Sequence, residues 1–467
     1  RLGRKAMVAV CPASCNTRRF VVRACFVLVS VLVFSYCLSF VLFTDWEREQ
    51  LYKSKPEGGG HRYTGKHEDI KVPVILWWTP FTKEPGRTKA CSNRSCFFTE
   101  DRAFFNHTRL YAIVFYGSEL EVGDLPLPRK ANHDWALLHE ESPKNNFLFC
   151  MPSVLHWFNH TATFSRNSDL PLTLQYLSGA KDLTSKEFFQ ETSKKNQARI
   201  RLAPIAYVQS DCNTPIERDA FVSELMNYID VDSYGKCVHN RDLPEGMTNA
   251  MDAMDDKGFW HLLARYKFHL AVENYGSDDY ITEKLWRPLI VGSVPIYHGS
   301  PSVADWLPNG SQSAVLISNY TGPKQLAEVI RRIDRNHMRY ESFLDHKIHE
   351  RISNQRLLNA LRHRRWGANN DPHKPNFVEE FECLICERLW KRLHSSNIRY
   401  MADETHYSCE PPKSILKEHA GTFWPELFKQ AELEARVLES LLQRNIPFGE
   451  ADVQASVLEL LQAHPTG

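Results

Sequence analysis

The chain has 467 residues, which is too long for one ordinary domain and fits two domains with additional segments. Its 43% hydrophobic and 12% aromatic content can fill a sizeable core. The 57 basic and 56 acidic residues nearly balance, so no global field favours nucleic acid as a partner. Any anionic ligand must therefore be held by a local site.

An apolar segment near the amino end predicts a membrane anchor. Residues 24–43 carry no charge, and a helix of about 20 residues crosses a hydrocarbon core. Basic residues precede the segment and acidic residues follow it, which predicts a cytosolic tail at 1–23 and a lumenal remainder. The alternative is a cleaved signal peptide, but the run is too long and no small-residue cleavage site closes it. We expect a single-pass type II membrane protein.

Sequons and cysteines after the predicted anchor also favour a lumenal chain. An even number of cysteines in an oxidising compartment is typical of disulfides. The Cys383-Leu-Ile-Cys386 sequence is also compatible with half of a zinc site or a redox pair, although no second CXXC or HXXXH motif accompanies it. The sequon asparagines are Asn93, Asn106, Asn159, Asn309 and Asn319, and the cysteines are Cys91, Cys96, Cys150, Cys212, Cys237, Cys383, Cys386 and Cys409.

The pattern along the chain predicts an α/β protein. Residues 44–70 are polar and contain three consecutive glycines, as in a flexible stem. Strand-like runs then alternate with helix-period segments, which predicts parallel sheets. After about residue 365 the pattern becomes helical, and the apolar stripe of 424–444 is more typical of a packed helix than of a partner site. The predicted strands are Val72–Trp78, Leu110–Tyr116, Trp135–Leu138, Pro204–Gln209, Phe268–Val272, Val294–Tyr297 and Ala314–Ile317.

The region from residue 268 to 299 predicts a strand, a polar turn, a helix and a second strand. The helix is expected to begin near Asp278 and to end at Gly292. Ligands of open α/β sheets lie at the carboxyl ends of strands, beside such helix starts. A helix N-terminus with Tyr280 and Lys284 suits a diphosphate, and Glu283 suits a sugar hydroxyl. A solvated helix face with a Glu/Lys pair is the alternative interpretation.

A second helix start is predicted before Arg218. Thr214 and Glu217 have the spacing of a capping box, with Pro215 at the first helical position. Arg218 in the first turn would add its charge to the helix dipole at a phosphate. Without further context, a solvated surface position is the more common interpretation of Arg218.

Two further acidic motifs are candidates for chemistry. Glu140 and Glu141 follow the predicted strand Trp135–Leu138, where a carboxylate can withdraw a proton from an acceptor hydroxyl; a charged loop is the alternative. Asp230-Val-Asp232 matches a DXD pattern that can chelate Mg²⁺ or Mn²⁺.

The motifs together resemble the α1,3-fucosyltransferase family. The resemblance rests on Glu273-Asn274, Asp279-Tyr280-X-Thr-Glu283-Lys284-Leu and Gly292-X-Val-Pro-Ile-X-X-Gly299, and it extends over residues 72–386. It implies two Rossmann-like domains facing across a cleft, of the GT-B type. The acceptor-side domain would span 71–195 and the GDP-fucose-binding domain 196–365, and a helical C-terminal extension would span 366–467.

The resemblance also implies roles for individual residues. Glu141 would be the general base, with Glu140 in reserve. Arg218, Tyr280 and Lys284 would bind the donor diphosphate, while Asn274 and Glu283 would orient donor hydroxyls. Cys212 and Cys237 would form a disulfide. The family is metal-independent, which argues against a metal at Asp230 and Asp232, and no cofactor is expected.

The reaction implied is inverting transfer of fucose from GDP-fucose. The branch resembled points to serine or threonine of folded lumenal domains, particularly of the EMI type, with the endoplasmic reticulum favoured over the Golgi apparatus. One alternative is α1,3-fucosylation of N-acetylglucosamine in N-glycans. Two rivals are a non-catalytic lumenal glycoprotein binder or chaperone and a metal-dependent transferase.

Overall fold

The computed structural model describes residues 62–244, 247, 256–368, 371, 373–395, 397–407, 409–416 and 421–463. The predicted cytosolic tail, the membrane anchor at 24–43 and most of the stem lie outside these residues. Within the described ranges, no helix combines the length and the apolar character that spanning a bilayer requires.

The first sheet has seven described strands in the order β2-β3-β1-β4-β5-β6-β7. All neighbours are parallel except β2 and β3, which form an antiparallel hairpin. The central strands are buried on both faces, which explains why they appear in the sequence as continuous apolar runs. The strands are β1 (Val74–Trp77), β2 (Arg87–Cys91), β3 (Arg94–Thr99), β4 (Leu110–Tyr116), β5 (Asp134–His139), β6 (His160–Thr163) and β7 (Leu170–Pro171).

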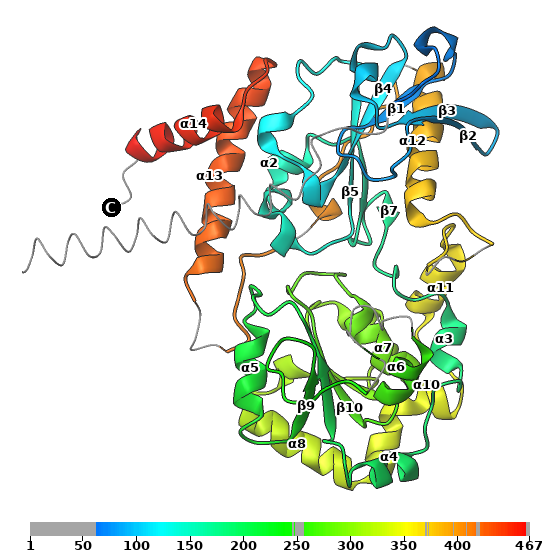
Figure 1. Ribbon diagram of the computed structural model, residues 1–467, viewed down its shortest axis with the longest axis vertical. Helices are drawn as coiled ribbons and strands as arrows, with labels where there is room; N and C mark the ends of the chain where they lie inside the picture. Colours follow the sequence, from blue (N-terminus) through cyan, green and yellow to red (C-terminus); the bar gives the residue numbers. More distant parts are fainter. Residues whose placement is uncertain are drawn as a thin grey trace, which may run out of the picture. The chain divides into compact units, whose positions relative to one another are not determined.

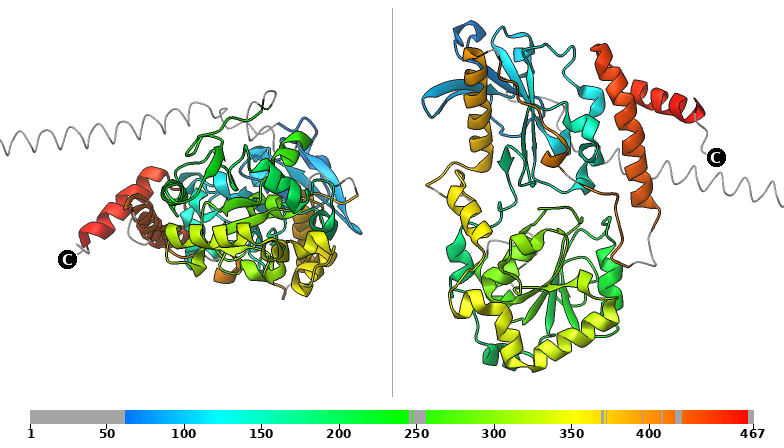
Figure 2. Two further views of the ribbon diagram at one scale, coloured as in Figure 1. Left: turned by 90° about the horizontal axis from the view of Figure 1, so that it is seen from below. Right: turned by 180° about the vertical axis from the view of Figure 1, so that it is seen from behind.

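Helices cover both faces of this sheet. The alternating residues Ile75, Val114 and Leu138 face α12 (Phe377–His394). The residues between them, including Phe115 and Leu137, face α2, the 3-10 helix η6 and α13. Figure 1 and the right-hand view of Figure 2 show α12 and α13 on opposite sides of the sheet. The bounds are α2 (Pro152–Leu155), η6 (Phe147–Cys150) and α13 (Phe423–Arg444).

The second sheet has five described strands, all parallel, in the order β13-β11-β10-β8-β9. Strand β8 leads to its neighbour β9 on one side, whereas β10 leads to β11 on the other. The loops after β8 and β10 therefore diverge, which creates the position where open α/β sheets bind ligands. The strands are β8 (Ile205–Val208), β9 (Val231–Tyr234), β10 (Phe268–Val272), β11 (Val294–His298) and β13 (Val315–Leu316), and β12 (Pro308–Ser311) lies outside this sheet.

The helices of the second sheet also form two layers. Helices α5 and α8 pack on one face, and α6 and α7 pack on the other. This is a three-layer, Rossmann-like arrangement, as the alternating sequence pattern predicts. The bounds are α3 (Ala180–Thr184), α4 (Thr192–Ala198), α5 (Arg218–Leu225), α6 (Lys257–Leu263), α7 (Glu283–Val291), α8 (Pro323–Arg335), α9 (His337–Glu341), α10 (Asp345–Ile348), α11 (Gln355–His363) and α14 (Glu450–Ala463).

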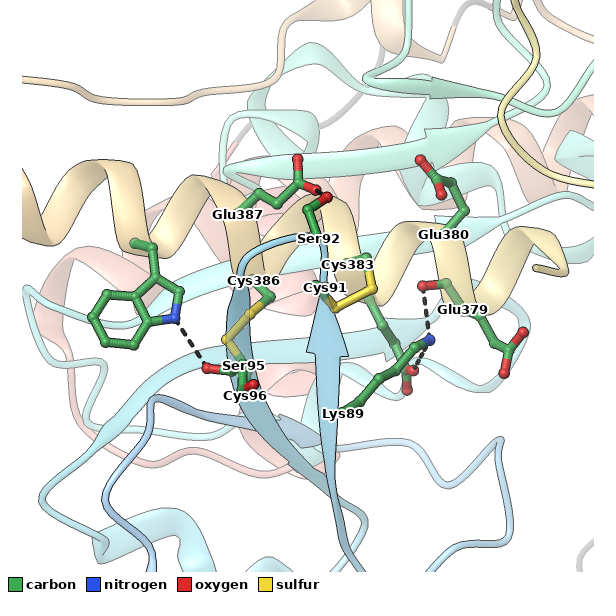
Figure 3. The surroundings of a disulfide bond; sticks show 12 residues. Lys89, Cys91, Ser92, Ser95, Cys96, Glu379, Glu380, Cys383, Cys386 and Glu387 are labelled. Carbon is green, nitrogen blue, oxygen red and sulfur yellow. Dashed lines mark hydrogen bonds and ion pairs between the residues drawn. A yellow bond between two sulfur atoms is a disulfide. The ribbon is translucent and has the colours of Figure 1, made fainter. Parts of the chain in front are cut away.

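Helix α12, at the start of the predicted C-terminal extension, packs on one face of the first sheet. Figure 3 shows α12 tied to the β2–β3 hairpin by two disulfides, Cys91–Cys383 and Cys96–Cys386. The CXXC motif therefore supplies two disulfides to another segment and is neither a zinc half-site nor a redox pair. Cys212 and Cys237 are bonded as expected, and Cys150 pairs with Cys409.

Two predicted helix starts are wrong. Helix α7 begins at Glu283 and not near Asp278, because Asp279 has a φ of 63° and the chain turns before Thr282 caps the helix. The predicted capping box at Thr214 is absent: α5 begins at Arg218, and Glu217 has a left-handed backbone without a side-chain cap bond. The end of α7 is as predicted, with Gly292 in the left-handed region at φ 71°.

Candidate active site

Two adjacent carboxylates extend from the carboxyl end of β5. Glu140 accepts a hydrogen bond from the Tyr116 hydroxyl at 3.3 Å, and its backbone oxygen accepts one from Gln175 Nε2 at 3.3 Å. Burial, reinforced by the charge of Glu141, raises the pKa of Glu140 to about 7. Glu140 is thus held in place by its neighbours and titrates near neutral pH.

Glu141 lies close enough to Glu283 and Lys284, at the start of α7, for their charges to shift its pKa. Burial raises the pKa of Glu141, Lys284 lowers it and Glu283 raises it. Its backbone oxygen accepts a hydrogen bond from the Tyr407 hydroxyl at 3.4 Å. The structure therefore brings together the two predicted motifs that carry Glu141 and Lys284.

The start of α7 is organised around the buried side chain of Glu273. Its carboxylate accepts hydrogen bonds from the Thr282 amide at 2.9 Å and the Thr282 hydroxyl at 2.7 Å. Lys284 Nζ lies 3.1 Å from Thr282 Oγ1, 3.0 Å from Glu283 Oε1 and 3.8 Å from Glu273 Oε2. A Cβ at Gly299 would lie 2.4 Å from Glu273 Cγ, so only glycine leaves room for this arrangement.

Glu283 remains ionised in this cluster. Burial alone would raise its pKa, but the charges of Lys284 and Arg287 outweigh burial and lower the pKa to about 2. An ionised carboxylate only accepts hydrogen bonds, so Glu283 suits a ligand hydroxyl. Lys284 is left as a fixed cation in the first turn of α7.

Arg218 is almost fully buried at the switch between β8 and β10. Its side chain is 1% exposed and donates to the backbone oxygens of Val272 at 3.2 Å and Asp211 at 2.6 Å. Arg218 Nε and Asn274 Oδ1 are buried and have no hydrogen-bond partner among the described residues. A charged donor and an amide oxygen without partners are suited to a polar ligand.

Tyr280 is placed differently from its predicted position on a helix. It precedes α7 and is 2% exposed. Its ring packs edge to face against that of Phe164, which follows β6, with 5.3 Å between the ring centroids. Burial and the charge of Glu273 raise the pKa of the Tyr280 hydroxyl.

Tyr176 lies near the candidate site residues, and the sequence did not single it out. Burial raises the pKa of its hydroxyl, and the charges of Glu283, Glu141, Glu140 and Glu273 raise it further. Tyr176 therefore lies within electrostatic reach of these four carboxylates. A single tyrosine outside the strands carries no motif, so no signal in the sequence would have identified it.

Asp279, a residue of the predicted motif, links the two halves of the chain. Arg166, which follows β6, donates to the Asp279 carboxylate through its backbone amide at 3.0 Å and through its guanidinium. Trp306 Nε1 and the Ser302 hydroxyl donate to the same carboxylate, each at 2.9 Å. These bonds fix the turn that leads into Tyr280 and Lys284.

The DXD motif is divided between exposed and buried positions. Asp232 lies in β9, and its carboxylate accepts from the Tyr266 hydroxyl at 2.7 Å and the Ala203 amide at 2.9 Å. Asp230 is exposed. In the part of the chain that the structure describes, the one group with metal-ligand spacing is Cys212, Asp219 and Cys237, and its two sulfurs are bonded to each other.

The sequon asparagines differ in accessibility. Asn93, Asn106 and Asn319 are exposed. Asn159 is half-buried, and its amide nitrogen donates to the Tyr400 backbone oxygen at 2.9 Å. Asn309 is half-buried as well.

The fold and the candidate site are those of a glycosyltransferase: two α/β sheets bring the Glu141 carboxylate, after β5, within electrostatic reach of Lys284, at the start of α7. Family comparison supports this class. Residues 70–175 match the model described as "Fucosyltransferase, N-terminal", and residues 194–403 match "Glycosyltransferase family 10 (fucosyltransferase) C-term". The chain belongs to glycosyltransferase family 10, the fucosyltransferases.

Relatives within the family extend over most of the chain. A protein of Bos taurus named GDP-fucose protein O-fucosyltransferase 3 is 47% identical over 399 residues, which cover 83% of each chain. The protein of the same name from Homo sapiens is 45% identical over 415 residues, or 85% of each chain. A solved α1,3-fucosyltransferase with GDP-fucose is a distant likeness: 16% identity, a TM-score of 0.38, and coverage of 73% of this chain and 97% of that one.

Proposed function

We propose that the chain transfers L-fucose from GDP-fucose to serine or threonine of folded protein domains, with inversion at the anomeric carbon. The proximity of Glu141 to Lys284 and Glu283 carries this proposal, because it places a base beside groups suited to a sugar nucleotide. Relatives of 45–47% identity that are named GDP-fucose protein O-fucosyltransferase 3 support both the donor and the class of acceptor.

The proposed mechanism is a single displacement. Glu141 takes the proton of the acceptor hydroxyl, whose oxygen attacks the anomeric carbon as the bond to GDP breaks. Arg218 and Lys284, with Tyr280 beside them, offset the negative charge that grows on the departing diphosphate. Asn274 and Glu283 orient donor hydroxyls. The raised pKa of Glu141 suits this step, since it makes the carboxylate a stronger base than an exposed one.

We propose that no metal takes part. Arg218 and Lys284 already supply fixed positive charge where a metal would act, and the Asp232 carboxylate is occupied by Tyr266 and Ala203. Activity should therefore survive excess EDTA. Loss of activity in EDTA that is restored by Mn²⁺ would favour the metal-dependent rival at Asp230 and Asp232.

The acceptor and the compartment are finer proposals. Within the family, the motifs resemble the divergent animal member called fucosyltransferase ten, whose branch points to EMI-type domains. Four disulfides support an oxidising compartment, and we propose the endoplasmic reticulum in preference to the Golgi, with residues 24–43 as the membrane anchor. N-acetylglucosamine of N-glycans is the second candidate acceptor, because the same base can serve either hydroxyl.

A donor and acceptor screen tests the proposal. The protein is incubated with GDP-fucose, GDP-mannose or UDP-sugars, and with a folded EMI-type domain, the same domain reduced and unfolded, or an N-glycan. We expect mass addition of one deoxyhexose on the folded domain only, and only with GDP-fucose. Transfer to the N-glycan alone would favour the second acceptor, and GDP binding without any transfer would favour a non-catalytic binder.

A further inference from the structure

The chain continues beyond the family match, which ends at residue 403, and the next residues contact both halves of the site. We call the described residues 402–407 and 409–416 the C-terminal strap. The strap is fixed to the first sheet at its start. Ala402 donates to the Phe158 backbone oxygen at 2.9 Å, Thr161 Oγ1 lies 2.8 Å from His406 Nδ1, and Cys409 is bonded to Cys150.

Tyr407 of the strap lies beneath the base. It is 1% exposed, and its ring packs 4.6 Å from Phe164 and 5.4 Å from His139, measured between centroids. Its hydroxyl donates to the Glu141 backbone oxygen at 3.4 Å. The strap thus supports the strand end that carries Glu141.

The strap then reaches the donor side. The Tyr275 hydroxyl, one residue after Asn274, donates to the Glu410 backbone oxygen. The Ile415 amide donates to the Ile216 backbone oxygen at 3.0 Å. Between the strap and the loops after β10 and β11 lies a cavity of about 300 Å³, which residues 275–278, 298, 299, 301 and 409–414 line.

The start of α13 continues these contacts. The Gly421 amide donates to Glu217 Oε1 at 2.8 Å, and Trp424 Nε1 donates to Asn213 Oδ1 at 3.0 Å. Residues 213–217 lead directly into Arg218, and Glu217 has a left-handed backbone with no side-chain cap for α5. The segment before Arg218 is therefore held by contacts from the end of the chain instead of by its own helix.

We propose that the strap and the start of α13 are a positioning element that holds Arg218 in place for the donor diphosphate and Asn274 in place for a donor hydroxyl. Tyr275 and Trp424 are positioning residues: each donates a hydrogen bond that joins a donor-side loop to the C-terminal segment. This inference rests on the proposed function, and it assigns a role to the segment after residue 403, where the family match ends.

The test uses the variants Tyr275→Phe and Trp424→Phe, which keep an aromatic ring at each position and remove one hydrogen-bond donor each. Losing one such bond should weaken donor binding about five-fold. We expect each variant to raise KM for GDP-fucose and the Kd for GDP by about that factor, with kcat within about two-fold. If a substitution only reduced the fraction of correctly folded protein, the apparent kcat would fall and KM would stay unchanged.

Matched control variants remove the same kinds of hydrogen-bond donor, a tyrosine hydroxyl and an indole N–H, at positions outside the strap and α13. Tyr340→Phe removes a hydroxyl bond to the Lys267 backbone oxygen, and Trp390→Phe removes an indole bond to the Ser95 backbone oxygen. Both controls should leave KM and Kd unchanged. Unchanged KM and Kd in active Tyr275 and Trp424 variants would overturn the strap's role alone. A wild-type chain that fails to bind GDP would instead overturn the proposed function, and this inference with it.

Discussion

Glu140 is a residue that costs stability. A carboxyl whose pKa is about 7 in the folded chain and 4.5 ordinarily binds its proton more tightly when folded. The folded state is therefore favoured at low pH, and this contribution is lost as the pH rises from 4.5 through 7. Such a cost is typical of functional positions, where a charge is held in a buried setting for chemistry.

The first prediction concerns Glu140→Gln, which keeps an oxygen that can accept from Tyr116. At pH 8 the variant should be more stable than the wild type by up to about 3 kcal/mol, because it removes a buried charge. The gain should vanish below pH 4.5, where Glu140 is protonated. Denaturant unfolding at both pH values measures it, and an equal gain at both would contradict the raised pKa.

The second prediction concerns N-glycosylation of the folded protein. The Asn159 amide is occupied by its bond to Tyr400, and its oxygen accepts from Arg129 at 2.7 Å and from the Trp135 amide at 2.9 Å. A glycan on Asn159 Nδ2 would compete for the space of its bond to Tyr400, so folded protein should carry none at Asn159. Peptide mass spectrometry should find glycans among the exposed Asn93, Asn106 and Asn319, and occupancy of Asn159 in folded protein would contradict the structure.

The sequence could predict site residues only where a motif marks them. Glu141, Arg218 and Lys284 were proposed through the family resemblance, and in the structure the charge of Lys284 acts on Glu141. Tyr176 and Tyr407 were not found, because their positions depend on segments far apart in the chain. Contacts between such distant segments cannot be predicted from the local sequence.

At the scale of elements, strands were predicted well and helix starts poorly. Strands β4 and β10 have the predicted bounds, because continuous apolar runs specify buried parallel strands. The starts of α5 and α7 depend instead on distant partners. Glu217 is bonded to Gly421, and Asp279 to Arg166. Propensity cannot anticipate these bonds, so both helices begin later than their local sequence suggests.

The third prediction tests the bond network at Asp279. The variant Arg166→Met leaves the Asp279 carboxylate, whose side chain is 4% exposed, without its guanidinium partner. We expect a loss of about 3 kcal/mol in the free energy of unfolding. The matched control is Arg332→Met, whose partner Glu328 is exposed, and it should cost at most about 1 kcal/mol. Equal losses would show that the Asp279 network does not hold the turn.

The fourth prediction concerns the two disulfides of α12. Cys91–Cys383 and Cys96–Cys386 close nearly the same loop, with sequence separations of 292 and 290 residues. Either bond alone causes most of the loss of unfolded-state entropy that the two bonds cause together. Replacing one pair by serine should therefore change the melting temperature little, whereas replacing both should cost about 4 kcal/mol or more. Additive losses from the two single-pair variants would contradict this redundancy.

For the whole molecule, the parallel α/β architecture follows from alternation of apolar runs with helical segments. The same pattern could not show that α12 returns to the first sheet, because that return depends on disulfides over separations of about 290 residues. Nor could it show that residues after 403 contact both halves of the site. Patterning specifies layers, whereas the way the chain closes on itself depends on particular side chains.

The central claim is that Glu141 is the base of a fucosyl transfer. The most direct test compares the wild type with Glu141→Gln in two measurements on the same protein: the transfer rate to a folded acceptor domain and the Kd for GDP. We predict that transfer falls at least about 100-fold, since general base catalysis contributes that much, while the Kd changes less than about three-fold. Full transfer activity in Glu141→Gln would contradict the account.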